Sequence, residues 1–105
     1  MSRVALLCPD LLFGSKVEGA LRAAGHEVRT VAEPQAAGDA ELLVIDLTAD
    51  AERRLEGLPE VPTLAFYSHV EQHVRRLAEA AGVDRVVPRS RMAREGARLV
   101  EAMLA

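Results

Sequence analysis

Cysteine and aromatic residues are scarce in this chain of 105 residues. The single cysteine, Cys8, excludes an internal disulfide and a cysteine-rich zinc site. One unpaired thiol is most simply explained by a reducing compartment, and we expect a cytoplasmic location. Because only Phe13, Phe66 and Tyr67 are aromatic, the core is expected to be built from aliphatic side chains.

Long hydrophobic runs and a basic excess are also absent. The apolar run near the N-terminus covers only residues 4–8, which is too short to span a membrane or to act as a secretion signal. The net charge of −3 gives no general attraction to nucleic acid or to an anionic membrane, so neither is expected as a partner. No GxGxxG dinucleotide fingerprint follows the first apolar run.

The sequence does contain a regular alternation of apolar strands and amphipathic helices. Half of the residues are hydrophobic, enough for one core, so residues 1–105 are expected to form a single domain. Alternation of this kind indicates an α/β fold, a three-layer doubly wound (βα)5 sandwich around a five-stranded parallel sheet. Strands are predicted at residues 4–8, 27–31, 42–47, 61–67 and 84–87, and helices at 12–24, 50–58, 68–81 and 91–104.

Helix ends follow from capping residues. Asp50 is predicted to cap the second helix, and the Ser68 and Glu71 spacing predicts a capping box at the start of the third. Gly25 and Gly82 are expected to end the first and third helices. Residues 33–39 are too short for more than a turn or a single helical turn.

Ligands of doubly wound sheets bind at the carboxyl ends of the strands, so polar residues there define a candidate pocket. Asp46 ends the clearest strand, and it is expected either to cap the next turn or pair with Arg89, or to serve an anion or metal. The other pocket residues predicted by this rule are Cys8, Asp10, Thr48, Tyr67, Ser68 and Arg89.

Three segments carry a resemblance to a known family: LLVIDLT with Asp46 in it, VPTLAFYSH, and AGVDRVVPRS. In order and spacing, essentially the whole chain resembles the receiver domain of bacterial response regulators in two-component signal transduction. The resemblance implies a flavodoxin-like sheet with strand order 2-1-3-4-5. It also implies that Asp46 occupies the position of the phosphoacceptor aspartate.

The match is incomplete at the other positions that receivers use. The acidic pair that holds Mg²⁺ in receivers falls on Cys8 and Pro9, and the hydroxyl of strand four falls on Tyr67, with Ser68 one residue beyond. The lysine position falls on Arg89. A thiol and a proline are poor ligands for Mg²⁺, so no cofactor is expected, and Asp10 and Asp46 alone would hold the metal weakly.

The leading hypothesis is therefore a stand-alone atypical receiver, or pseudo-receiver, which is not an enzyme and acts by binding another protein. With no output domain in the sequence, signalling would pass through contacts with separate chains. In receivers the last two helices and strand five commonly meet partners, and we expect a protein partner or a homodimer there. The residues predicted for this face are His69, His73, Arg85, Arg91, Met92, Leu99 and Met103.

Two alternatives remain open. In the first, the chain is a working phosphoacceptor in which Asp46 is phosphorylated, Arg89 clamps the charge and Ser68 supplies the hydroxyl. In the second, it is a small-ligand binder or a thiol enzyme that uses Cys8 at the cleft. The simpler expectation is that Cys8 is a small core hydrophobe and that His69 and His73, which lack a third ligand, lie on a solvated face.

Overall fold

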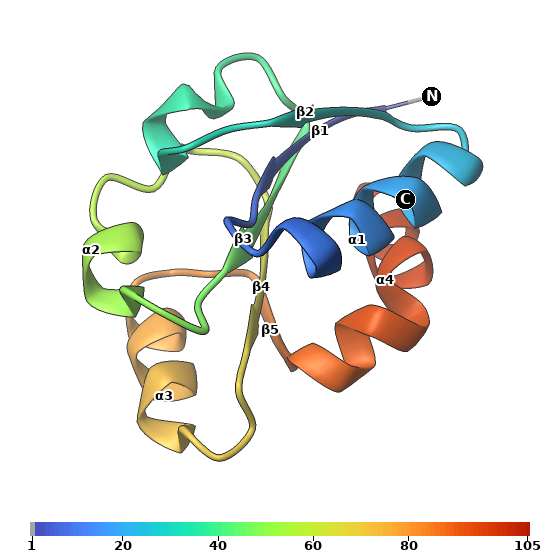
Figure 1. Cartoon of the computed structure of the whole chain (residues 1–105). Coiled ribbons are helices and arrows are strands. Elements are labelled where there is room, and N and C mark those ends of the chain that lie inside the picture. Colours follow the sequence, from blue (N-terminus) through green and yellow to red (C-terminus); the bar gives the residue numbers. More distant parts are fainter. Residues whose placement is uncertain (1) are drawn as a thin grey trace.

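The computed structural model describes residues 2–105, in which strands and helices alternate along the whole chain (Figure 1). The strands are β1 (Arg3–Leu7), β2 (Glu27–Thr30), β3 (Leu42–Asp46), β4 (Thr63–Tyr67) and β5 (Arg85–Pro88). The α-helices are α1 (Leu11–Ala23), α2 (Ala51–Leu55), α3 (Gln72–Ala80) and α4 (Arg89–Leu104). No helix within residues 2–105 has the length and apolar character needed to cross a membrane.

The five strands form one parallel sheet in the order β2-β1-β3-β4-β5, as the family resemblance implied. Pairing in register places Leu6 beside Val44 and Val44 beside Leu64, so apolar residues from three strands run side by side across the sheet. All five residues of β3 and of β4 are buried, because these central strands are covered on both faces.

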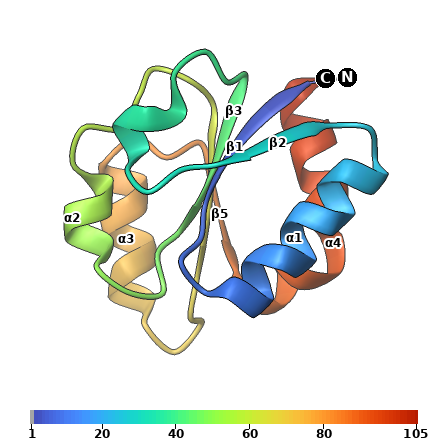
Figure 2. The same cartoon turned by 45° about the horizontal axis from the view of Figure 1, so that its top comes forward.

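The helices divide between the two faces of the sheet. Helices α1 and α4 lie together on one face, and α2 and α3 lie on the other (Figure 2). Side chains alternate along each strand, so Phe66 enters the core under α1 and α4, whereas Tyr67 enters the core under α2 and α3. Both cores are otherwise aliphatic, as the composition predicted.

Helix α2 is shorter than expected, covering residues 51–55 rather than 50–58. Asp50 does stand at the N-cap position, but its backbone is left-handed (φ 52°) and its side chain makes no capping hydrogen bond. The chain leaves the helix at Glu56 and turns at Gly57, whose φ of 67° favours glycine. The prediction of Asp50 as a capping side chain is therefore wrong.

Helix α3 begins one turn later than predicted. The Glu71 N–H donates to the Ser68 carbonyl (2.9 Å), which closes a turn before the helix starts at Gln72. The predicted capping box is consequently absent, and Val70, inside the range predicted for this helix, lies before it and is 75% exposed. Between β2 and β3 the chain forms only a 3₁₀ turn, η1 (Pro34–Ala37), which agrees with the prediction for residues 33–39.

Candidate functional site

The candidate site lies at the carboxyl edge of the sheet, where β1, β3, β4 and β5 end next to one another. Cys8, Pro9 and Asp10 follow β1, and Asp46 is the last residue of β3. Arg89 is the first residue of α4, directly after β5. The parallel arrangement therefore brings together residues that are up to 79 positions apart in the chain.

The Asp46 carboxylate is almost completely buried and already has partners. Its exposure is 2%, and its Oδ1 atom accepts hydrogen bonds from the Thr48 N–H (2.8 Å) and the Thr48 hydroxyl (2.6 Å). From α2, the buried Arg54 guanidinium donates to the Asp46 carbonyl oxygen at 2.8 Å. These contacts give Asp46 the turn-capping role that the sequence left open, and they leave Oδ1 fully used.

The Cys8 thiol lies beside Asp46. Its Sγ atom is 3.7 Å from Asp46 Oδ2 and 3.6 Å from the Asp10 carbonyl oxygen. Burial, reinforced by the negative charge of Asp46, raises the pKa of Cys8 to about 11. The thiol is therefore protonated near neutral pH, which argues against the thiol-enzyme hypothesis.

Asp10 forms the most specific contact of the site. Its Oδ1 atom accepts the Phe13 N–H at 3.0 Å, which caps α1, and its Oδ2 atom accepts from the Arg89 guanidinium at 2.8 Å. These two donors, the Phe13 N–H first, hold the pKa of Asp10 below its ordinary value. The Arg89 guanidinium also lies over the Phe13 ring, 4.2 Å from its centroid. Arg89 thus pairs with Asp10, and the predicted pairing with Asp46 is wrong.

The predicted pocket residues do not share one cavity. A cleft of about 430 Å³ is lined by Thr48, Ser68 and Arg89, together with His69, Phe13, Ser90 and Ala93. Cys8 lines a separate hollow, beside Arg54. Tyr67 is 1% exposed and lies in the core between the sheet and helices α2 and α3. Its prediction as a pocket residue is therefore wrong. The reason is that adjacent residues of a strand face opposite sides of the sheet.

Comparison with known proteins supports this architecture at the level of structure only. No protein-family model matches the sequence, and no curated protein matches it. A CheY-like receiver domain protein from Methanospirillum hungatei JF-1 superposes with a TM-score of 0.80 at 15% identity, covering 99% of this chain and 94% of that one. A response regulator receiver protein from Burkholderia phymatum gives a TM-score of 0.76 at 21% identity, covering 99% and 95%.

The chain has the receiver fold. A third similar structure is described as a novel family of redox sensors in the streptococci that evolved from two-component response regulators. It gives a TM-score of 0.75 at 14% identity over 98% of this chain and 51% of that one. At these identities the likeness establishes the fold, and the residues of the site have to be judged on their own chemistry.

The residues at the edge of this receiver fold do not fit Mg²⁺. Pro9 has no side-chain ligand, the protonated Cys8 thiol is soft, and both carboxylate oxygens of Asp10 already accept hydrogen bonds. Asp46 keeps only Oδ2, since Oδ1 is taken by Thr48. Across residues 2–105, no three His, Cys, Asp or Glu side chains are grouped so that they could hold a metal ion.

The predicted partner face of the receiver fold is only partly at the surface. Met92 and Leu99 are 1% and 4% exposed because they pack into the core between α4 and the sheet. Their assignment to a partner face is therefore wrong, whereas Arg85, Arg91 and Met103 are partly exposed. His73 lies on α3, but His69 precedes that helix, so the two histidines do not share a helical face.

Two contributors to the site escaped the sequence analysis. Phe13 supports Arg89 and also packs against Phe66, with the ring centroids 5.1 Å apart. The scarcity of aromatic residues was the one signal that could have drawn attention to Phe13. Arg54 is 8% exposed and contacts the end of β3, but nothing in the sequence distinguishes it from the other arginines.

Proposed function

We propose that this receiver-fold chain is a signalling module that works by binding another protein, without Mg²⁺-dependent phosphoryl transfer. The observation that carries this proposal is the Asp10–Arg89 pair, in which a carboxylate of the same chain already binds the Arg89 guanidinium. The basic group that would face a transferred phosphoryl group is held by a carboxylate and an aromatic ring instead.

Phosphoryl transfer to a carboxylate requires an accessible oxygen and a metal ion that neutralises charge on the transferring group. Asp46 is 2% exposed and is held by Thr48, and the neighbouring residues are poor ligands for Mg²⁺. The streptococcal structure described as redox sensors evolved from response regulators supports the idea that a receiver fold can serve other signals.

A titration of the purified chain tests the loss of phosphoryl chemistry. Thermal stability and ¹H–¹⁵N spectra are recorded with Mg²⁺ alone and then with Mg²⁺ and beryllofluoride, a phosphoryl analogue. We expect no stabilisation and no shifts at Thr48, Ser68 or Arg89. Stabilisation by beryllofluoride that disappears in Asp46→Asn would contradict the proposal and support a phosphoacceptor.

The family resemblance predicts self-association through α3, β5 and α4, whereas the surface of that face supports a monomer. With Met92 and Leu99 in the core, the exposed part of that face is mostly charged. We therefore expect sedimentation equilibrium to give a monomer at micromolar concentration. A concentration-dependent dimer that is weakened by Arg91→Glu would place the contact there.

A further inference from the structure

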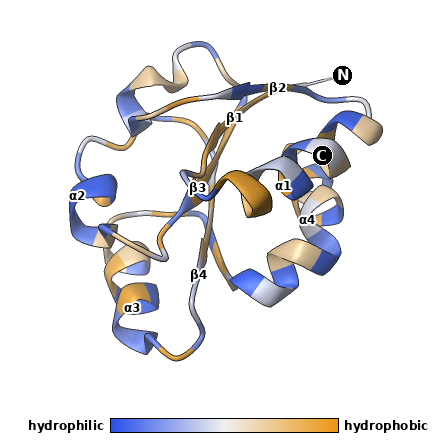
Figure 3. Cartoon of the chain, viewed as in Figure 1, coloured by the Kyte–Doolittle hydropathy of each residue, from blue (hydrophilic) through white to orange (hydrophobic). Residues whose placement is uncertain are grey.

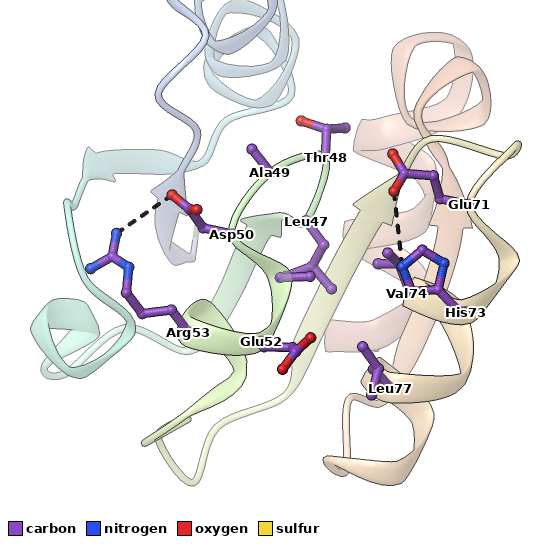
Figure 4. Close-up of a pocket in the computed structure, with 11 residues that line it drawn as sticks. Leu47, Thr48, Ala49, Asp50, Glu52, Arg53, Glu71, His73, Val74 and Leu77 are labelled. Carbon is purple, nitrogen blue, oxygen red and sulfur yellow. Dashed lines mark ion pairs between the residues drawn. The ribbon is translucent and has the colours of Figure 1, made fainter.

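Two adjoining hollows run along the line between α2 and α3, and Figure 4 shows the first of them. The first has a volume of about 400 Å³ and is lined by residues of the β3–α2 loop, of α2 and of the first half of α3. The second has a volume of about 370 Å³ and continues toward the end of α3, past Leu55 and Ala80. Glu52 and Leu77 line both hollows, so the two form one groove, called here the α2–α3 groove.

The groove arises from a difference in helix length. Helix α2 has five residues and α3 has nine, which correspond to about 7.5 Å and about 13.5 Å of helix. The shorter helix cannot cover the flank of the longer one. Leu77, in the middle of α3, is consequently left 37% exposed.

The floor of the groove is aliphatic and firmly held. Leu47 and Val74 are 1% and 4% exposed, and they belong to the core between the sheet and this pair of helices. Leu77 lies beside them and faces the opening, as Figure 4 shows. An apolar side chain entering the groove would therefore meet mainly the exposed part of Leu77, which the buried Leu47 and Val74 support.

The rim of the groove is acidic. Asp50, Glu52, Glu56 and Glu71 are opposed only by Arg53, which gives the lining a net charge of −3 with neutral histidine, as much as the whole chain carries. The Arg53 charge is shared between Asp50 at 3.9 Å and Glu33 at 3.5 Å. Within residues 2–105, Glu52 and Glu56 form no ion pair.

We propose that the α2–α3 groove docks a cationic amphipathic segment of a partner protein. An aliphatic side chain of that segment packs on Leu47, Val74 and Leu77, and its arginine or lysine residues pair with Glu52 and Glu56. This inference rests on the protein-binding function proposed above and specifies the chemistry of the partner. Negative charge on the rim guides a basic segment toward the groove and rejects acidic ones.

A second copy of the chain that docks through its basic helix α4 suits the groove less well. Its basic counterpart would be α4, where Arg91, Arg94 and Arg98 surround Glu95 at 3.4–4.0 Å. That helix offers no large apolar side chain that is well exposed, because Met92 and Leu99 are buried. Charge complementarity with α4 is therefore present, but the aliphatic anchor that the floor requires is missing.

The test uses a synthetic helical peptide with leucine on one face and arginine on the other as the probe. Binding to the full chain is followed by ¹H–¹⁵N spectra and calorimetry. We expect shifts to concentrate at Leu47, Val74 and Leu77, and affinity to fall as salt rises. Two companion peptides, one with glutamate for arginine and one with serine for leucine, should bind far more weakly.

Variants then separate the two contributions. Leu77→Asn should weaken binding about tenfold by removing the anchor surface. The double variant Glu52→Gln/Glu56→Gln should weaken it about fivefold. Matched controls outside the groove are Leu12→Asn, at a leucine that is 88% exposed, and Glu27→Gln/Glu60→Gln, which removes the same charge; both should bind as the wild type does.

Several outcomes would overturn the groove assignment. They are no binding at millimolar peptide, shifts centred on α4 and β5, equal losses in the control variants, or self-association that depends on Leu77 without added peptide. Shifts on α4 and β5 would leave the protein-binding function intact. Conversely, beryllofluoride binding at Asp46 would remove the proposed function while the groove result stood, so the two failures are distinguishable.

Discussion

The two faces of the sheet are covered very differently. On one face, α1 and α4, with 13 and 16 residues, pack over a closed core, and the polar residues at their starts are joined by the Asp10–Arg89 pair. On the other face, α2 and α3 have only five and nine residues and leave an acidic groove. Figure 3 shows the contrast in hydropathy, with a hydrophilic α2 beside a hydrophobic band on α3.

The difference between the two faces indicates where the molecule can bind a partner. A short helix cannot cover the whole side of a longer neighbour, so helix length determines how much of that neighbour stays exposed. At the carboxyl edge of the sheet, the side chains of Asp46, Asp10 and Arg89 all bind groups of the same chain. The acidic groove with the partly exposed Leu77 lies on the opposite face of the sheet.

Truncating one leucine on each face gives the largest expected contrast. Leu21 in α1 is fully buried, so Leu21→Ala should lower the free energy of unfolding by about 3 kcal/mol. Leu77→Ala in α3, at a residue 37% exposed, should cost less than about 1 kcal/mol. Urea denaturation measures both, with Leu12→Ala as an exposed control. Equal costs at the two sites would contradict the picture of one sealed and one open face.

Because the pKa of the Cys8 thiol is raised, we expect its alkylation to be slow. A pKa raised from 9.0 to about 11 lowers the thiolate population about 100-fold at pH 8, so iodoacetamide should react with native Cys8 about 100 times more slowly than with the urea-unfolded chain. Because the folded state keeps this proton longer than the unfolded state, Cys8 should also cost stability as the pH rises from about 9 to about 11.

Cys8→Ser provides the control for the alkaline effect, since it removes the titrating group and leaves the rest of the site in place. In the variant, the melting temperature should change less with pH between about pH 9 and about pH 11. A native thiol that reacts as fast as the unfolded one would show that Cys8 is available for chemistry.

Removing the Asp46 carboxylate should destabilise the closed site. Asp46→Ala leaves the partly buried Thr48 N–H and hydroxyl without their acceptor, and we expect a loss of about 1 kcal/mol in urea denaturation. Asp46→Asn keeps an oxygen at that position and should cost clearly less. Asp39→Ala, at a side chain 81% exposed, is the control. A stabilising Asp46→Ala would mean instead that the carboxylate is strained and reserved for function.

The smallest expected effect is in the acid range. The lowered pKa of Asp10 contributes stability that is present above about pH 5 and is lost as the pH falls through 3.8 and below. Asp10→Asn retains an N-cap but lacks this titration, so the melting temperature of the variant should depend less on pH in that window. An unchanged acid dependence would show that the Asp10–Arg89 pair adds little to the closed site.

Much of the fold was readable because it depends on local pattern. The runs 42–45 and 64–66 are apolar throughout, and this identifies strands buried on both faces. The family resemblance then gave the strand order, which the structure confirms. Helix starts were less predictable, since Ser68 and Asp50 have capping side chains but the backbone around them forms turns of another kind.

In the candidate site, too, some features could be predicted from the sequence and others could not. The sequence by itself determined that Asp46, Asp10 and Arg89 follow strands of one parallel sheet, and so must meet at one edge. This conclusion follows from residue identity and strand order alone. The family resemblance added that Cys8 and Pro9 stand at the positions where receivers have their metal-binding acidic pair.

Only the tertiary structure decided which of these residues bind one another. Arg89 pairs with Asp10 and lies on Phe13 rather than reaching Asp46, because Asp46 is buried under Thr48 and Arg54. Met92 and Leu99 are in the core because α4 packs on α1, which the helical pattern of α4 does not specify. The α2–α3 groove likewise exists only where two helices of unequal length meet on a shared sheet, a relation between distant segments that local sequence cannot express.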